Sequence, residues 1–291
     1  MVTARAPATS ANVGSGFDTF GIALESPYDT VTVSRAATTT IEVHGTGASY
    51  VPEDPEANTV GAVARELDAP AHIRIDKGVR PASGMGSSAA SAAAAAVALN
   101  ELYGLGYDRE ALIPIAAEGE AVVSGTAHTD NVAPALLGGF TVGRADGTTA
   151  VETELSLVVC LPDIAVSTRD AREAVPERVS MADHVTTVGN AATVAVGVCR
   201  DDPKLVGRGM ADPVVTPARA AFVDGYETVC AAAREAGATG VTISGAGPAL
   251  LAVVRPGRSR AVAAAMVEAF DEHGVEARSF RTGVGDGAHC R

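Results

Sequence analysis

Lysine is nearly missing from this 291-residue chain, which holds only Lys77 and Lys204, and tryptophan is missing altogether. Acidic residues number 35 against 22 basic ones, so the formal net charge is −13. Nucleic acids and anionic membranes are both bound through clustered cations, so this balance argues against either as a partner. An acidic coat instead suits concentrated salt, which screens the repulsion between like charges. The composition therefore predicts a protein of a salt-loving, halophilic host.

Long apolar segments and paired cysteines are also missing. No apolar run approaches the roughly 20 residues that a membrane-spanning helix needs. The first residues lack the charged start and apolar core of a signal peptide. We therefore expect a cytoplasmic protein. The four cysteines are scattered without a CxxC pair, which predicts neither a zinc site nor a disulfide framework.

The chain does hold a mixed set of strand and helix patterns, with 47% hydrophobic residues to build a core. These patterns interleave in both halves, and a polar stretch separates the halves near residues 145–154. This predicts two α/β or α+β units, over residues 1–150 and 151–291. The strands expected are 31–35, 40–44, 72–76, 138–144, 155–160, 163–168, 241–244, 249–254 and 276–281. The helices expected are 58–68, 87–103, 108–123, 216–237 and 259–274.

The most informative segment is a glycine- and serine-rich loop at residues 81–90, which runs into an alanine-rich helix. Glycines let backbone N–H groups approach a phosphate chain closely, and the helix aims the positive end of its dipole at the anion. The loop lacks the lysine of the GxxxxGK[ST] motif and the spacing of the GxGxxG motif. Alone it predicts either a phosphate-binding turn or a serine-capped turn between a strand and a helix.

Two further glycine segments flank this loop in the sequence. One is APATSANVGSGFD at residues 6–18, and the other is TISGAGPA at residues 242–249. Each alone is compatible with an ordinary turn. Three such loops at the start, middle and end of one chain favour a phosphate-binding site over three unrelated turns.

Together the three segments resemble the GHMP kinases, the family of galactokinase, homoserine kinase, mevalonate kinase and phosphomevalonate kinase. The middle loop is similar to the ATP loop of that family, and the resemblance extends over nearly the whole chain. Within the family the chain resembles the homoserine kinases. The segments that carry this are PATSANVGSGFD (7–18), GEAVVSGTAHTDNVAPALLGGF (119–140), TRDAREAVP (168–176) and SGAGPA (244–249).

The resemblance implies an α+β fold made of two GHMP kinase domains. The N-terminal, ATP-binding domain is expected to be similar to the second domain of ribosomal protein S5, with a left-handed βαβ crossover that departs from the usual right-handed rule. The C-terminal domain is expected to be ferredoxin-like. The implied activity is transfer of phosphate from ATP, with Mg²⁺, to L-homoserine, giving O-phospho-L-homoserine for threonine biosynthesis. The family also implies a homodimer.

The resemblance assigns residues to ATP and to the metal ion. Ser88 and Glu120 match the serine and glutamate that hold Mg²⁺ in the family, and oxygen ligands suit this hard ion. The candidate catalytic residues are Glu120, Asp130 and Asn131. The candidate ATP-binding residues are Asn58, expected near the adenine, and Pro81, Ala82, Ser83, Gly84, Met85, Gly86, Ser87, Ser88, Ala89 and Ala90.

Homoserine is a zwitterion, so its site needs an anion for the ammonium group and cations for the carboxylate. Asp18, beside Asn12, fits the first role. Arg172 and Arg219 fit the second, because a guanidinium group presents two parallel donors to a carboxylate. The candidate substrate-binding residues implied by the resemblance are Asn12, Asp18, His128, Thr168, Arg172 and Arg219.

Two questions stay open at this stage. Asp130 could take the hydroxyl proton of the substrate as a general base, or the reaction could proceed without a base while the phosphates take the proton; we favour the second picture. The activity could also be that of another kinase of the family, acting on mevalonate or shikimate, or the chain could be an ATP-binding regulator without catalysis. Damage to Ser88 or Glu120 would indicate a regulator, and both residues are intact.

Overall fold

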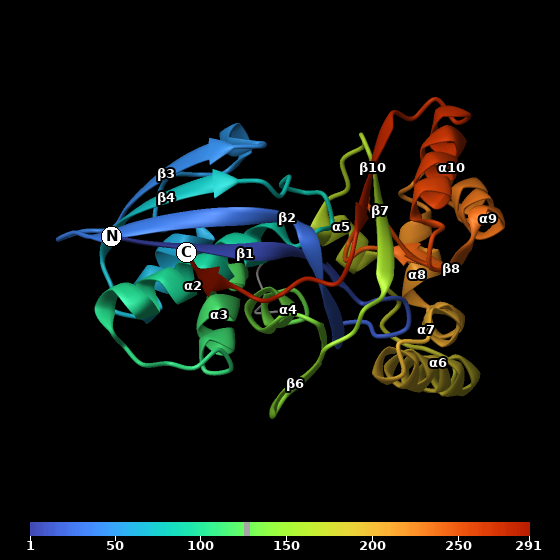
Figure 1. Ribbon diagram of the computed structural model, residues 1–291, viewed down its shortest axis with the longest axis horizontal. Coiled ribbons are helices and arrows are strands. Elements are labelled where there is room, and N and C mark those ends of the chain that lie inside the picture. Colours follow the sequence, from blue (N-terminus) through green and yellow to red (C-terminus); the bar gives the residue numbers. More distant parts are fainter. Residues whose placement is uncertain (125–128) are drawn as a thin grey trace.

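The chain folds into two β-sheets that lie side by side along the long axis of the molecule, each covered by helices (Figure 1). The computed structural model describes residues 1–124 and 129–291. Within these residues no helix combines the length and the apolar character needed to cross a bilayer. The prediction of a two-unit α+β fold is confirmed.

The first sheet has seven strands, in the order β11-β1-β2-β4-β3, with the β5–β6 hairpin attached to β2. Its strands are β1 (Val2–Ala11), β2 (Phe20–Arg35), β3 (Thr40–Gly45), β4 (Ala71–Lys77), β5 (Phe140–Arg144), β6 (Gly147–Val151) and β11 (His289–Cys290). β3 and β4 are parallel neighbours and helix α1 connects them, so the expected βαβ unit is present. The left hand of this crossover stays a prediction.

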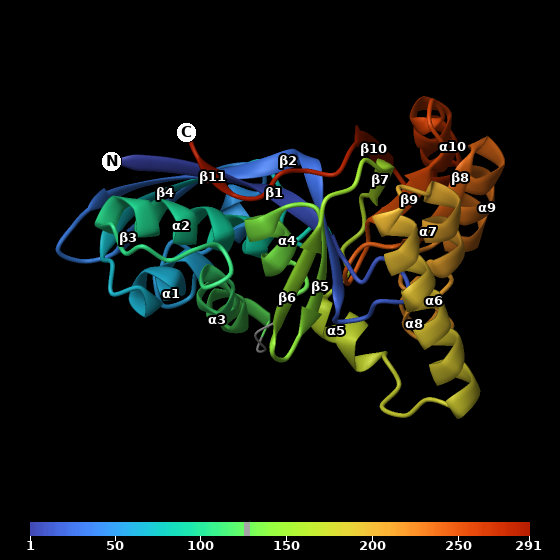
Figure 2. The same ribbon diagram turned by 60° about the horizontal axis from the view of Figure 1, so that its bottom comes forward.

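Helices cover one face of the first sheet (Figure 2). They are α1 (Thr59–Glu66), α2 (Ser87–Tyr103), α3 (Leu112–Ser124) and α4 (Val132–Leu137), while the short 3₁₀ helix η1 (Ala48–Tyr50) follows β3 and contacts that strand. Helix α2 is buried along its whole middle, from Ala89 to Leu99. It contacts β1 and β2 as well as α1, α3 and α4, and alanine side chains are small enough to let all these elements approach. The alanine run therefore places the start of α2 under the glycine loop.

The second sheet has the strand order β10-β7-β9-β8, and every neighbouring pair is antiparallel. Its strands are β7 (Ser156–Pro162), β8 (Ala238–Ile243), β9 (Leu250–Val254) and β10 (Ala277–Thr282). Helices follow β7 and β9, so the chain reads βαββαβ, which confirms the ferredoxin-like prediction. The helices are α5 (Thr168–Glu173), α6 (Met181–Cys199), α7 (Pro203–Gly209), α8 (Val215–Ala220), α9 (Tyr226–Ala236) and α10 (Ser259–Asp271).

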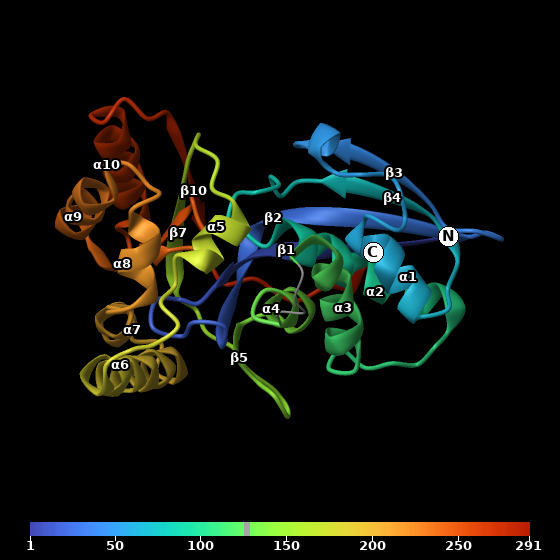
Figure 3. The ribbon, with the colours of Figure 1, turned by 180° about the vertical axis from the view of Figure 1, so that it is seen from behind.

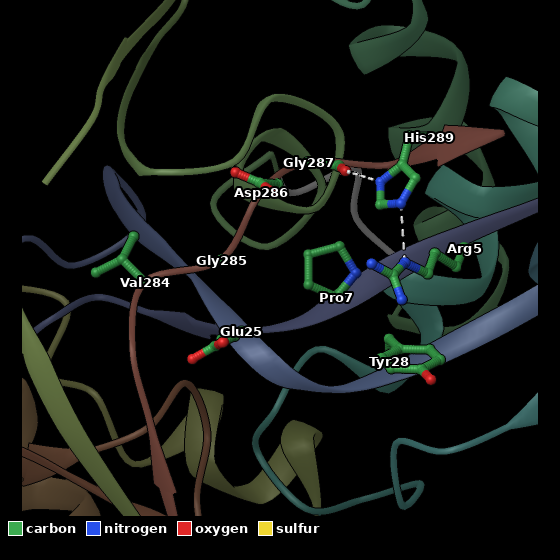
Figure 4. A pocket seen from close by; sticks show the side chains of 9 residues that line it. All are labelled: Arg5, Pro7, Glu25, Tyr28, Val284, Gly285, Asp286, Gly287 and His289. Atoms are coloured by element: carbon green, nitrogen blue, oxygen red, sulfur yellow. Dashed lines mark hydrogen bonds between the residues drawn. The ribbon is translucent and has the colours of Figure 1, made fainter. Parts of the chain in front are cut away.

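The last residues of the chain return to the first sheet, where β11 pairs with β1. Figure 4 shows this return: the Nε–H of Arg5 donates to Nε2 of His289 over 2.9 Å, beside a small cavity of about 230 Å³. Apart from β11, strands β1 to β6 belong to the first sheet and strands β7 to β10 to the second. The contiguous division into 1–150 and 151–291 does not include this return and stays a prediction.

Some local predictions were wrong. Residues 163–168 are not a strand, because the register of β7 with β10 ends at Pro162 and helix α5 already begins at Thr168. The single helix expected over 216–237 is two helices, α8 and α9, which are separated near Gly225, whose φ is 80°. The strand β1 was not expected; it contains Pro7, which lies where the register with β2 shifts. Helices α6 and α7 were also missed.

Candidate active site

A cavity of about 800 Å³ lies over the start of α2 and is lined by elements of both sheets. Most residues that the sequence assigned to ATP or to catalysis line it. They are Asn58, Pro81, Ala82, Ser83, Gly84, Gly86, Ser87, Ser88, Glu120 and Asn131, and the substrate candidate Thr168 also lines it. Three ATP-loop candidates do not line it: Met85, Ala89 and Ala90 are buried in the core beneath. They shape the turn from behind.

The three glycine segments meet at one edge of this cavity. The hydroxyl of Ser244 lies 2.7 Å from the carbonyl oxygen of Gly84 and 2.8 Å from Oγ of Ser10, so it touches the other two segments at once. Backbone bonds add to this contact. Thr9 N–H donates to Met85 O over 3.1 Å, and Gly245 N–H donates to Ala11 O over 3.2 Å. Segments from the beginning, middle and end of the chain therefore form one structure.

Two glycines of the middle loop are required by its shape. Gly84 has a φ of 79°, and a Cβ there would lie 2.5 Å from the carbonyl oxygen of Ser244. Gly86 has a φ of 60°, and a Cβ there would overlap Oγ1 of Thr9. Positive φ and the absence of room both exclude larger side chains. The loop can adopt this turn only with glycine at these positions.

Gly86 is also the N-cap residue of α2, and among the described residues no side chain caps the first turn of that helix. The first N–H groups of a helix have no partners inside the helix. At α2 they stand at the wall of the cavity, where the helix dipole favours a negative charge. This end of the helix can therefore accept an anion such as a phosphate group.

Ser88 and Glu120 lie together at the cavity wall, on α2 and α3. The Ser88 hydroxyl donates to Oε2 of Glu120 over 2.8 Å. Burial raises the pKa of Glu120 to about 7, and the nearby Asp130 adds to this, while the hydroxyl of Ser88 and the charge of Lys77 oppose it. A carboxylate with this environment gains from a cation beside it, and two oxygen ligands are available for a hard metal ion.

Asp130 and Asn131 follow, just before α4. Asn131 lines the cavity, and its Oδ1 accepts from the Thr9 hydroxyl over 2.8 Å. Asp130 is buried and does not line the cavity. Burial raises the pKa of Asp130 to about 6, with a further contribution from the negative charge of Asp18.

Asp18 and Arg172 form a two-pronged ion pair, with distances of 2.7 Å and 2.9 Å between guanidinium nitrogens and carboxylate oxygens. Arg172 comes from α5, the short helix at the junction of the two sheets (Figure 3). The sequence assigned these residues to opposite ends of a zwitterion. In the structure they neutralise each other, which the sequence did not reveal.

Arg219, on α8, completes this charged cluster. It is buried, and it donates to Gly245 O over 2.7 Å and to Ala171 O over 3.2 Å. The ring of Phe17 lies 5.1 Å from the guanidinium carbon of Arg219 and 5.2 Å from that of Arg172. Burial and the like charge of Arg172 lower the pKa of Arg219. An additional anion near this cluster would be stabilised.

Asn12 joins the charged cluster to the glycine segments. Its side-chain amide donates to Gly245 O over 3.1 Å, and its Oδ1 accepts from the backbone N–H of Asp18 over 3.0 Å. Since Gly245 also lines the cavity, the charged cluster lies next to the space over α2. His128, the remaining substrate candidate, lies outside the described residues.

Asn58 has a structural role that its assignment to adenine did not include. Its Oδ1 accepts from Val60 N–H over 3.0 Å and caps α1, and its amide donates to Pro52 O. The side chain is 2% exposed, yet it stands at the cavity wall. Its position agrees with a residue at the edge of a nucleotide site.

Several residues of the cavity wall were missed by the sequence. Tyr50, Val51 and Pro52 follow β3, and Arg278 comes from β10. No motif marks these residues. Lys77 was identified only as one of two lysines, although it lies four residues before the glycine loop begins at Pro81, and that position was the available signal.

Comparison with protein families gives two matches. Residues 57–139 match the N-terminal domain of the GHMP kinases, and residues 194–272 match the C-terminal domain of the same family. The matched ranges include the middle glycine loop, Glu120, Asp130 and Arg219.

Curated relatives are similar over nearly their full length. A homoserine kinase of Halorubrum lacusprofundi is 68% identical over 99% of this chain and 98% of that protein. One of Natronomonas pharaonis is 66% identical, over 99% of each chain. These relatives are haloarchaeal, which agrees with the halophilic character expected from the charge. One of Methanocella arvoryzae is 46% identical over 98% of this chain and 96% of that protein.

Solved structures agree with the architecture. The crystal structure of homoserine kinase from Cytophaga hutchinsonii superposes with a TM-score of 0.90 at 33% identity, covering 100% of this chain and 97% of that one. Mevalonate kinase of L. major in complex with R-mevalonate reaches a TM-score of 0.75 at 18% identity, over 97% of this chain and 95% of that one, and shows the fold alone.

Proposed function

The chain belongs to the homoserine kinases of the GHMP kinase family, and on this premise we propose how its residues transfer the γ-phosphoryl group of ATP to the hydroxyl group of L-homoserine. Phosphoryl transfer depends on positioning the reactants and stabilising their charge more than on covalent chemistry. The observation that carries the proposal is the meeting of three glycine segments beside one charged cluster, with Gly245 common to both.

ATP is assigned to the cavity over α2. The uncapped N–H groups at the start of that helix face the phosphates, and Gly84 and Gly86 allow the backbone to come close. Asn58 and the residues after β3 are placed to enclose the base. The phosphates are then held by main-chain groups, so a chain almost without lysine can bind a polyanion.

Magnesium is assigned to Ser88 and Glu120, whose side-chain oxygens lie 2.8 Å apart at the cavity wall. Both are hard oxygen ligands, and Glu120 sits where burial disfavours its negative charge. The ion supplies charge neutralisation for the phosphates when it is bound. Ser88 also belongs to the first turn of α2, so one residue links the metal ligands to the phosphate-binding backbone.

L-homoserine is assigned to the charged cluster. Its ammonium group replaces Arg172 as a partner of Asp18, and its carboxylate binds Arg172 and Arg219. Asn12 positions Asp18 through the backbone N–H of that residue. Thr168, on the same helix as Arg172, lines the cavity that is assigned to ATP and is assigned to the substrate as well.

The reaction is assigned no general base. Asp130 is buried and interacts with the charges of Asp18, Arg172 and Arg219, so it is the residue that would take the hydroxyl proton if a base were used. Asn131 does line the cavity and can orient polar groups there. The proton passes to the phosphates in this proposal.

We also infer from the family that the chain is a cytoplasmic homodimer. Helix α6 supports a second copy as partner, because Met181, Val185 and Val188 are 74%, 63% and 54% exposed. These positions follow a helical spacing of four and three residues, which gives one apolar stripe. Light scattering after size exclusion tests this, and a monomer at micromolar concentration in molar KCl contradicts it.

The function itself is tested by ADP release with Mg-ATP in molar KCl, using L-homoserine, mevalonate or shikimate as acceptor. The expected result is release that depends on L-homoserine, with O-phospho-L-homoserine as the product. Preference for mevalonate or shikimate would assign the chain to another activity of the family. ATP binding without turnover of any acceptor would indicate a regulator.

A further inference from the structure

Lys77 is an unusual residue for this chain, because only one other lysine exists and Lys77 is buried. Its side chain is 2% exposed, and that of its partner Asp29 is fully buried. Buried ion pairs are expensive to desolvate, and apolar side chains of the same volume often give equal or greater stability. Since the chain contains only two lysines, the burial of one of them indicates a role other than stabilising the fold.

All hydrogen-bond donors of Lys77 are used inside the protein. A lysine ammonium group has three N–H donors. In this structure they reach the Asp29 carboxylate, the Ser87 carbonyl oxygen at 2.8 Å and the Ser91 hydroxyl at 2.9 Å. Lys77 lines the cavity, but no donor is left for a phosphate oxygen. The residue therefore cannot replace the lysine of a GxxxxGK[ST] loop.

Two of these acceptors lie one helical turn apart at the start of α2. Ser87 is the first residue of the helix, and Ser91 stands four residues later. None of the described side chains caps this helix. Lys77 fixes its first turn instead, through hydrogen bonds to Ser87 and Ser91. The direction of the first N–H groups depends on how this turn is oriented.

Asp29 holds the other side of the turn. Its Oδ1 accepts the backbone N–H groups of Gly78 and Val79, over 2.9 Å and 3.0 Å, and its Oδ2 accepts from Ser91 over 2.7 Å. The Ser87 hydroxyl donates to Val79 O over 2.8 Å. The chain that enters the glycine loop and the helix that leaves it are thus fixed to one buried ion pair.

We propose that Lys77 and Asp29 are positioning residues for ATP: they fix the start of α2 so that its N–H groups and the Ser88 hydroxyl face the phosphates, without touching the nucleotide themselves. This inference rests on the proposed function for the identity of the nucleotide. In a GxxxxGK[ST] loop the lysine binds the phosphates directly. In this chain the backbone N–H groups bind the phosphates, and the lysine only orients that backbone.

The test uses Asp29→Asn/Lys77→Met in the full chain, with Lys204→Met as a control at the exposed lysine of α7. The double variant leaves no buried charge unpaired, and the amide oxygen that replaces a carboxylate oxygen can still accept the Gly78 and Val79 N–H groups. Binding of a non-hydrolysable ATP analogue with Mg²⁺ is measured by calorimetry without homoserine. We expect a melting temperature close to that of the parent protein. The dissociation constant of the ATP analogue should rise about tenfold, which corresponds to the free energy of roughly one hydrogen bond to a charged group.

Steady-state kinetics provide a second measurement of the same proposal. The KM for ATP should rise in the double variant while the KM for homoserine stays unchanged, and Lys204→Met should change neither. A merely structural pair would lower the active fraction, and therefore kcat, at constant KM. Parental affinity for the analogue in a folded double variant would overturn the proposal.

If the double variant does not fold, Ser91→Ala serves instead, because it removes one acceptor of Lys77 and one donor to Asp29. A raised dissociation constant supports the proposal, and an unchanged one overturns it. Because the analogue is measured without homoserine, absence of homoserine turnover in the parent protein would refute the proposed function and leave this test intact.

Discussion

The glycine turn and the charged cluster, two neighbouring regions of one site, are built on opposite principles. Residues 81–89 carry no charged side chain, and their geometry comes from glycines, alanines and contacts between three backbone segments. The charged cluster consists of Asp18, Arg172 and Arg219, grouped around one phenylalanine ring. Under the proposed function, one site therefore binds one anion through main-chain N–H groups and the other through guanidinium groups.

The difference between the two regions leads to separate predictions, and the largest expected effect concerns Glu120, a proposed metal ligand that lies on α3 beside the glycine turn. Glu120→Gln keeps the size of the side chain but removes its negative charge. We expect kcat to fall about a thousandfold, since charge stabilisation of the transferring group carries most of the catalysis. Single-turnover rates at saturating ATP and homoserine measure this. A loss below tenfold would remove Glu120 from the metal site.

A large effect is also expected from the charged cluster, but on the other substrate. Arg172→Met removes a two-pronged donor, so the KM for homoserine should rise about a hundredfold while the KM for ATP stays within about twofold. Steady-state kinetics with each substrate varied in turn separates the two constants. Equal increases in both would show that the two regions are not independent.

Asp130 lies between the two regions and should matter less than either. Asp130→Asn is expected to lower kcat by less than about tenfold, because the proposal assigns no proton transfer to its carboxylate. Circular dichroism confirms that the variant is folded. A drop of several powers of ten would make Asp130 the general base.

Stability should respond to the buried carboxyl group of Glu120. Burial raises its pKa to about 7, above the ordinary value, so the folded state prefers the protonated form. The stabilisation from that preference is complete at low pH and is lost as the pH rises through 7. Without ligands, the free energy of unfolding of Glu120→Gln at pH 8 should therefore exceed that of the parent by on the order of a few kcal/mol, and the variant should unfold at a higher temperature.

Melting curves at several pH values measure this difference, which should vanish as the pH falls below about 4, where the glutamate is protonated in both states. A variant that is equally or less stable than the parent at pH 8 would contradict the assigned environment.

The smallest effect is expected from the acidic surface residues around both regions, because each of them contributes little to the melting temperature. With a net charge of −13, the folded chain should melt at a higher temperature in molar KCl than at low salt, because screening removes repulsion among acidic groups. Calorimetry at the two salt concentrations measures it, and equal melting temperatures would show that the acidic coat has no such role.

The two regions also differed in how far the sequence revealed them. Glycine positions require particular backbone geometry, so the turn at Gly84 and Gly86 and its fusion with the other two segments followed from the motif. The pairing of Asp18 with Arg172 joins residues 154 positions apart, and it depends on how α5 is placed, which no local pattern encodes. The Lys77 network was missed for the same reason, since Asp29, Lys77 and Ser91 come from three different elements.

In the fold, short patterns succeeded where local composition decides the structure, as in the alanine-rich α2 and the apolar strands of the second sheet. They failed where tertiary contacts decide it. Strand β1 persists through Pro7 because the register shifts there, and β11 exists only because the chain end returns to β1.

The central claim is that the charged cluster binds both charged groups of a zwitterion, while the glycine turn binds ATP independently. Comparing three acceptors at saturating Mg-ATP tests this claim most directly. L-homoserine is compared with 4-hydroxybutanoate, which lacks the ammonium group, and with 3-aminopropanol, which lacks the carboxylate. The account predicts that kcat/KM falls at least about a hundredfold for each analogue, with an unchanged KM for ATP. Turnover of either analogue as efficient as that of L-homoserine would contradict it.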